Sequence, residues 1–207
     1  MQKIALGIGS RKETKSTRSL LTAGVIAGPL FIIVPLIEMF IRPGFDIKRH
    51  AISVLSLGDL GWIQIGVFVL TGLLTIACAV GMRRIMYPGP SGTWGPLLIG
   101  AFGFGMIMAG IFPTDPGFGF PPDAPEGMPA SMSWHAILHS VAFFLAFSAL
   151  PMANFVFVRR FASMRQVGWA AYCLATGVAF FIAGIMAVGW VAAMAAQLFT
   201  DTTLENE

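Results

Sequence analysis

Five long apolar runs without a polar face constrain this chain more than any other sequence feature. They cover residues 20–41, 62–82, 95–112, 134–158 and 168–199. Each is at least about 18 residues long, and a helix of about 20 residues crosses the hydrocarbon core of a bilayer. A surface helix of a soluble protein would instead carry charged residues along one side. The pattern therefore predicts helices that cross a membrane.

The composition agrees with this prediction. Of the 207 residues, 56% are hydrophobic and 11% are charged, whereas a soluble domain carries about 25% charged residues. We therefore predict an all-α integral membrane protein, a bundle of five transmembrane helices. The last run would form a helix of about 48 Å, longer than the bilayer core is thick. A break at Gly184 or Gly189, which would give six helices, is the alternative.

The sequence predicts one transmembrane domain over residues 20–199, between a tail at 1–19 and an acidic tail at 200–207. Basic residues gather at one end of the predicted helices, and such clusters are typical of cytoplasmic segments. We therefore expect a cytoplasmic N-terminus. The basic sequence pI of about 9.2 reflects this topology and predicts no nucleic-acid partner. The clusters are Lys3, Arg11, Lys12, Lys15 and Arg18 before the first run, Arg83 and Arg84 after the second, and Arg159, Arg160 and Arg165 after the fourth.

All three histidines lie at the opposite end of the predicted helices. His50 lies in the loop after the first run, and His135 and His139 open the fourth run. Asp115 follows the third run at the same level, and Ser53 lies near His50 in sequence. We expect these segments to converge on one pocket below the extracytoplasmic surface.

The spacing of His135 and His139 is suited to binding a metal ion. Imidazoles four residues apart project from one helical face, and zinc then needs a third ligand, here His50 or Asp115. An open fourth position would hold a water whose pKa falls to about 7, which provides a hydroxide nucleophile. Asp115, Asp46 or Glu126 would serve as the general base, and Ser53 would donate a hydrogen bond to the metal or to an oxyanion.

Structural roles are the alternative for the same polar residues. His135 would then be an interfacial residue, and His139 would hydrogen-bond a backbone carbonyl or Asp115 and brace the helices. Glu38, near the end of the first run, is expected to be an interfacial carboxylate rather than a member of the polar group. Cys78 and Cys173 are expected to be free thiols that pack in the helices.

Three segments carry a resemblance to a known family: "PGFDIKRHAISVLSLGDLGWIQ", "GIFPTDP" and "SWHAILH". They resemble the signature segments of a multi-pass prokaryotic membrane family catalogued as domain of unknown function 998, over about residues 20–199. The resemblance implies typically six helices in the plasma membrane and implies no activity. This chain departs from the pattern at residues 183–189, where the link between the fifth and sixth helices is shortened or lost. The segments contain His50, Ser53, Asp115, His135 and His139.

The residue types are also similar to the zinc site of the alkaline ceramidase and adiponectin receptor group of intramembrane hydrolases. That group has seven helices and a different order of Ser and His, so the likeness concerns the site alone. We therefore expect a metal-dependent, hydrolase-like site at the extracytoplasmic face that acts on a lipid or an amphipathic amide or ester. The alternative is a non-enzymatic accessory subunit that packs against a larger membrane complex or against further copies of itself.

Overall fold

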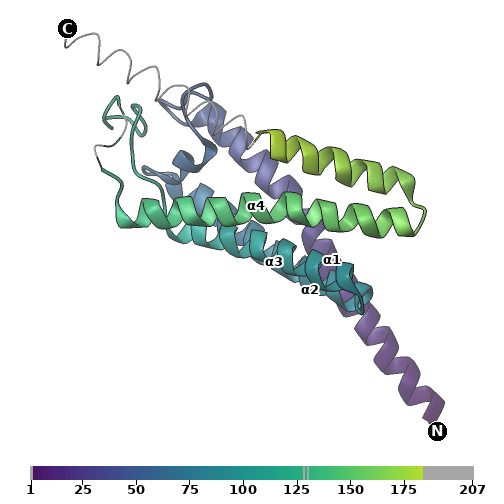
Figure 1. The fold of residues 1–207 in the computed structure, drawn as a ribbon. Coiled ribbons are helices and arrows are strands. Elements are labelled where there is room, and N and C mark those ends of the chain that lie inside the picture. The colour runs from purple at the N-terminus through teal and green to yellow at the C-terminus, as the bar shows by residue number, and fades with distance from the viewer. Residues whose placement is uncertain (1, 128, 130, 184–207) are drawn as a thin grey trace.

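A computed structural model describes residues 2–127, 129 and 131–183. The elements, in chain order, are α1 (Gln2–Ile41), the short 3₁₀ helix η1 (Ile52–Ser56), α2 (Gly61–Met86), α3 (Pro90–Ile111) and α4 (Trp134–Ser163). A shorter apolar helix, Val167–Ala183, follows α4 (Figure 1). The candidate break at Gly184 or Gly189 and the tail at 200–207 lie outside the described residues.

Four of these helices are long and apolar enough to cross a membrane. The spans are Thr14–Ile41, Gly61–Met86, Pro90–Ile111 and Trp134–Ser163. The predicted all-helical membrane fold with five helices is therefore confirmed, and the chain is a multi-pass membrane protein by helix length and hydropathy.

The helices extend beyond the apolar runs that predicted them. α1 begins at Gln2, so the predicted tail at 1–19 is largely helical, and α2 continues through Arg83 and Arg84. Hydropathy marks only the part of a helix that suits lipid, whereas its backbone hydrogen bonds continue into the polar region. The arginines in the last turn of α2 also interact favourably with the partial negative charge of a helix C-terminus.

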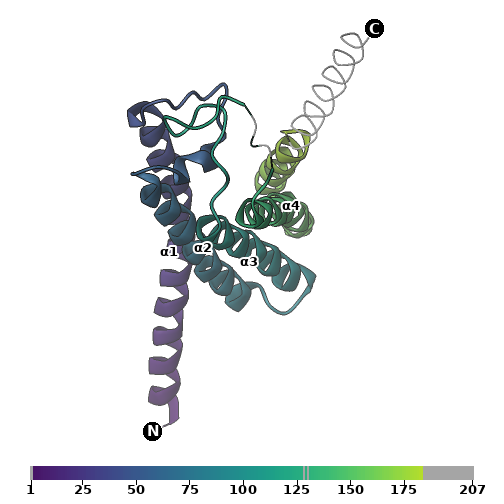
Figure 2. The same cartoon turned by 90° about the vertical axis from the view of Figure 1, so that its left-hand side faces the viewer.

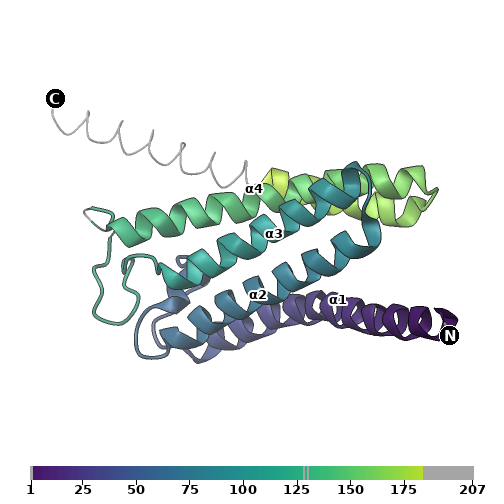
Figure 3. The same ribbon diagram turned by 90° about the horizontal axis from the view of Figure 1, so that it is seen from below.

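α1 to α4 pack in chain order, with α1 against α2, α2 against α3 and α3 against α4. Figure 3 shows them side by side in this sequence. Val167–Ala183 runs beside α4, and Phe180 lies with its ring centroid 6.1 Å from that of Phe147.

Glycine allows the backbones of α2 and α3 to approach each other closely. A Cβ atom on Gly72 would collide with the carbonyl oxygen of Gly103, and one on Gly103 would lie 2.7 Å from the carbonyl oxygen of Gly72. Gly105 of α3 approaches α4 in the same way, because a Cβ there would lie 2.8 Å from the carbonyl oxygen of Ala142. Within lipid, such backbone contact supplies packing that hydrophobic burial cannot.

Phe68 of α2 occupies the centre of the small buried core. Its ring centroid lies 6.2 Å from that of Phe31 in α1 and 6.3 Å from the ring of His139 in α4. Met106, Ala109 and Ala142 complete the buried cluster. This core therefore connects all four long helices, toward the end of the bundle where α3 ends and α4 begins.

The two ends of the molecule differ in their connections. The long segment 42–60 and the described residues of 112–133 gather at one end, which we call the loop cap (Figure 2). At the other end, residues 87–89 and 164–166 form short turns. Four of the five candidate site residues, all except His139, belong to the loop cap or to the first turn of α4 beside it, and His139 lies one turn further along α4.

Candidate functional site at the loop cap

Buried Arg42 connects α1 to both segments of the loop cap. Its Nη1 donates to the Leu55 carbonyl at 2.9 Å, and its Nη2 donates to the Leu57 carbonyl. Its guanidinium carbon lies 5.4 Å from the ring centroid of Phe120, in cation–π contact. Arg42 therefore holds the first segment in place and contacts the second.

Glu38 shares this burial, which corrects the prediction of an interfacial carboxylate. It is 1% exposed, and its Oε1 lies 3.4 Å from Nη1 of Arg42. Its other oxygen, Oε2, is buried without a hydrogen-bond partner in the described chain. A charge removed from water needs a partner of opposite charge, and the i,i+4 spacing supplies Arg42 on the same helical face.

His50 connects the two cap segments to each other. Its Nδ1 accepts the Asp46 main-chain N–H at 2.9 Å, and its Nε2 lies 2.9 Å from the Phe118 carbonyl oxygen. A carbonyl only accepts, so Nε2 carries the proton. The rings of Phe45 and Phe120 flank the imidazole, each with its centroid at 5.5 Å. Both ring nitrogens of His50 are therefore used within the cap.

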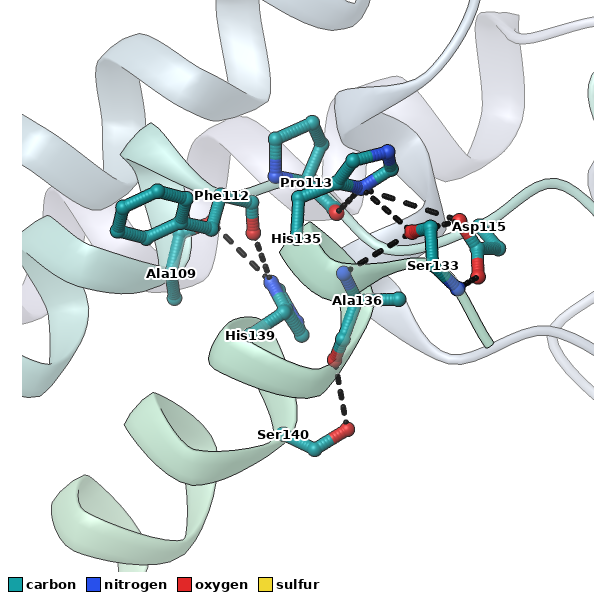
Figure 4. A network of polar contacts seen from close by, with 9 residues as sticks. All are labelled: Ala109, Phe112, Pro113, Asp115, Ser133, His135, Ala136, His139 and Ser140. Carbon is teal, nitrogen blue, oxygen red and sulfur yellow. Dashed lines mark hydrogen bonds and ion pairs between the residues drawn. The ribbon is translucent and has the colours of Figure 1, made fainter. Parts of the chain in front are cut away.

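Asp115 is bound to Ser133, the N-cap residue of α4 (Figure 4). Asp115 Oδ2 accepts the Ser133 N–H at 2.7 Å, and Oδ1 accepts the Ser133 hydroxyl at 2.5 Å. The Ser133 hydroxyl, then its N–H and finally nearby His135 hold the pKa of Asp115 below its ordinary value of 3.8. Asp115 is thus ionised at neutral pH.

His135 lies beside this carboxylate with one nitrogen engaged. Its Nδ1 lies 3.0 Å from the Pro113 carbonyl oxygen, 3.0 Å from Ser133 Oγ and 3.8 Å from Asp115 Oδ1. The hydroxyl proton of Ser133 points to Asp115 and the Pro113 carbonyl only accepts, so the proton of the neutral imidazole is on Nδ1. Nε2 makes no hydrogen bond with the described residues, and the side chain is 36% exposed.

His139 closes the end of α3. It is buried, and its Nδ1 lies 2.8 Å from the Phe112 carbonyl oxygen and 3.2 Å from that of Ala109. The last carbonyls of a helix have no partner within the helix, so His139 supplies one from α4. This is the backbone contact that the structural alternative predicted.

A family described as "Protein of unknown function (DUF998)" matches residues 25–203. The chain belongs to this family. The predicted resemblance is thereby confirmed, and the DUF998 match includes every candidate residue of the loop cap. No curated protein and no solved structure matches the chain.

The DUF998 fold brings the predicted segments together but not the predicted zinc ligands. His50 has no free nitrogen, and Asp115 faces the Nδ1 edge of His135, away from Nε2. In the described part of the chain, no group of three or more His, Cys, Asp or Glu residues is placed to hold a metal ion. These positions do not fit a site in which His135 and His139 share an ion with His50 or Asp115.

Ser53 makes no hydrogen bond with Asp115 or with any of the three histidines. Its carbonyl accepts the Ser56 hydroxyl at 2.7 Å within η1, and its own hydroxyl makes no hydrogen bond to a described residue. The predicted role of Ser53 at a metal or an oxyanion therefore has no support from its hydrogen bonds.

Two residues of this DUF998 site were missed from the sequence, although each carried a signal. Ser133 directly precedes the apolar run at Trp134, the position where a helix N-cap is expected. Arg42 follows Glu38 by four residues at the end of an apolar run, a spacing that predicts an ion pair. The carbonyls that orient the histidines carried no comparable signal.

Proposed function

We propose that the loop cap carries an acid–base site centred on His135, and that the protein hydrolyses a lipid or another amphipathic ester or amide at the membrane surface. One observation carries the proposal. The imidazole is held at Nδ1 by the Pro113 carbonyl and lies beside an ionised carboxylate, whereas Nε2 has no partner among the described residues.

This arrangement suits general-base catalysis. A proton on Nδ1 leaves the lone pair on Nε2, which can take a proton from water as that water attacks a carbonyl carbon. Asp115 stabilises the imidazolium that forms, and the imidazolium then returns the proton to the leaving group. Ser133 is not the nucleophile, because its hydroxyl proton is donated to Asp115. The proposal contains no metal step, since the described donors do not fit a three-ligand site.

The test uses full-length protein in detergent with two probes, a short-chain p-nitrophenyl ester and a phosphatidylcholine with a quenched fluorescent acyl chain. His135→Gln is expected to lower hydrolysis by at least about 100-fold, the usual contribution of a general base. Asp115→Asn lowers it less, and Asp123→Asn, an exposed acid of the same loop, leaves it unchanged. Thermal unfolding confirms that each variant is folded.

Two results would reject the proposal. The first is wild-type protein that hydrolyses neither probe, and the second is a folded His135→Gln variant with wild-type activity. Full loss of wild-type activity in a chelator would contradict the metal-free mechanism and restore the zinc hypothesis for His135 and His139.

A second candidate function is the accessory subunit, favoured by a different observation. Less than half of each candidate span is buried within the described chain, and α4 exposes the neighbouring rings of Phe143, Phe144 and Phe147. In this function the histidines only brace the cap, and these faces pack against a larger membrane complex or a second copy. Cross-linking in native membranes before solubilisation tests it, because a subunit gives a discrete larger species that Phe144→Ala weakens and His135→Gln does not.

A further inference from the structure

An apolar groove extends from the end of the molecule opposite the loop cap toward the middle of the helices. It runs between α2 and α3, reaches α4, and has a volume of about 660 Å³. Ligand sites typically enclose about 300 to 1,000 Å³, so the groove is large enough for part of a small molecule. Residues that form it include Ala79, Val80, Leu97, Gly100, Phe104 and Leu145.

The floor of the groove is made by small residues. Ala79 is buried, and a Cβ atom built on Gly100 would meet only the Ala79 Cβ, at 4.0 Å. Val80, Leu97 and Phe104 are exposed along its sides. Space above a glycine floor between exposed apolar side chains fits a flexible hydrocarbon chain.

Arg83 gives one end of the groove a positive charge. Its guanidinium carbon lies 4.9 Å from the ring centroid of Tyr87, and both side chains are exposed. Arg83 forms no ion pair with a described residue, in contrast to Arg42 and Arg49 at the loop cap. An arginine beside an exposed tyrosine is typical of the headgroup level of a bilayer.

The carboxylates lie elsewhere. Within residues 14–183, the described acidic side chains belong to the loop cap or to the end of α1 beside it, namely Glu38, Asp46, Asp59, Asp115, Asp123 and Glu126. The groove end carries Arg84, Arg159, Arg160 and Arg165 in addition to Arg83. Basic pockets between transmembrane helices bind the headgroups of anionic lipids.

We propose that this groove binds an anionic phospholipid, with one acyl chain over Gly100 and the phosphate paired with Arg83. The site is independent of the proposed hydrolase site, because it lies at the other end of the helices. It predicts two separable contributions, an apolar one from the glycine floor and a charged one from Arg83.

Native mass spectrometry of the full-length chain in detergent tests both contributions. The probes are phosphatidylglycerol and phosphatidylcholine with identical acyl chains, and inorganic phosphate alone. Phosphatidylglycerol is expected to bind about fivefold more tightly than phosphatidylcholine, the effect of one basic residue near an anionic headgroup. Phosphate alone is expected not to bind.

Matched variants separate the contributions. Arg83→Gln is expected to remove the preference for phosphatidylglycerol, whereas Arg160→Gln, at the same end but outside the groove, keeps it. Gly100→Leu is expected to weaken the binding of both lipids at least fivefold, whereas Gly66→Leu, where a Cβ meets nothing within 4 Å, leaves binding unchanged. Thermal unfolding without added lipid checks that all four variants are folded.

Several outcomes would overturn the proposal. They are an unchanged preference in Arg83→Gln, an equal loss in Arg160→Gln, binding of phosphate alone, and equal lipid binding by Gly100→Leu and Gly66→Leu. A dimer that dissociates only in Gly100→Leu would likewise overturn it, because the groove would then be an interface between two copies.

Discussion

His50 of the loop cap and His135 beside it hold their protons on different ring nitrogens, and this difference separates their roles. His50 accepts a main-chain N–H at Nδ1 and donates from Nε2, so its ring is fully used in connecting two loops. His135 faces a carbonyl at Nδ1 and keeps Nε2 unbonded to described residues. Only the second arrangement leaves a lone pair for proton transfer.

The buried pair of Glu38 and Arg42 gives the first prediction. Arg42→Gln is expected to lower the free energy of unfolding by about 3 kcal/mol or more, because it leaves the Glu38 charge buried and two carbonyls of the cap unbonded. Glu38→Gln is expected to cost only about 1 kcal/mol, since Arg42 keeps both carbonyls. Denaturant titration of the purified protein measures both.

Equal losses for the two variants would show that the cap depends on the ion pair and not on the bonds from Arg42 to the loop. Arg49→Gln is the control, because its ion pair with Glu126 lies on the surface, where such pairs contribute little.

At this scale, the sequence could predict which segments meet but not which residues bond with one another. The topology rule placed His50, Asp115 and His135 at one end, and the structure confirms that their segments converge there. The ring orientations depend on the carbonyls of Pro113 and Phe118, which every residue type possesses. Residue identity therefore carries no signal for these partners.

At the scale of helices, hydropathy could predict the existence and order of the elements but not their ends or contacts. The apolar runs cover only the part of each helix that would lie in lipid. The helices themselves are longer, because α2 continues to Met86 and α3 already begins at Pro90. Proline suits the first turn of a helix, where its missing N–H costs nothing. The helix faces that contact each other are determined by individual glycines, at which two backbones approach closely.

Two glycines of α2 give the second prediction. A substitution to alanine is expected to change the stability differently at the two positions. Gly72→Ala is expected to destabilise the protein by about 1–3 kcal/mol, because its methyl group would press on the Gly103 carbonyl. Gly66→Ala has free space and is expected to be neutral or to stabilise by up to about 1 kcal/mol. Thermal unfolding compares the two, and equal effects would show that α2 and α3 do not pack at Gly72.

At the scale of the whole molecule, the two ends differ in charge. Within residues 14–183, the described acids lie toward the loop cap and most of the described arginines lie at the short turns. Since arginine-rich segments are retained in the cytoplasm, the loop cap with His135 is expected to face outward.

Cysteine labelling in intact cells tests this orientation. The two natural cysteines are buried free thiols and give a low background. A membrane-impermeant maleimide is expected to label Asp59→Cys in the loop cap, but to label Gln166→Cys, in the turn after α4, only after the cells are permeabilised. The reverse pattern would invert the topology and place the proposed hydrolase site in the cytoplasm.

The packing of α1 to α4 in chain order has a consequence for biosynthesis. Each new helix can dock on the one inserted just before it, so the row can grow during translation without waiting for distant sequence. The loop cap is the exception, because the carbonyl that His50 requires lies 68 residues further along the chain. The first loop therefore cannot reach its final structure until the third helix has been inserted and Phe118 has been synthesised. Nascent chains arrested before Phe118 are expected to be the most susceptible to quality-control proteases.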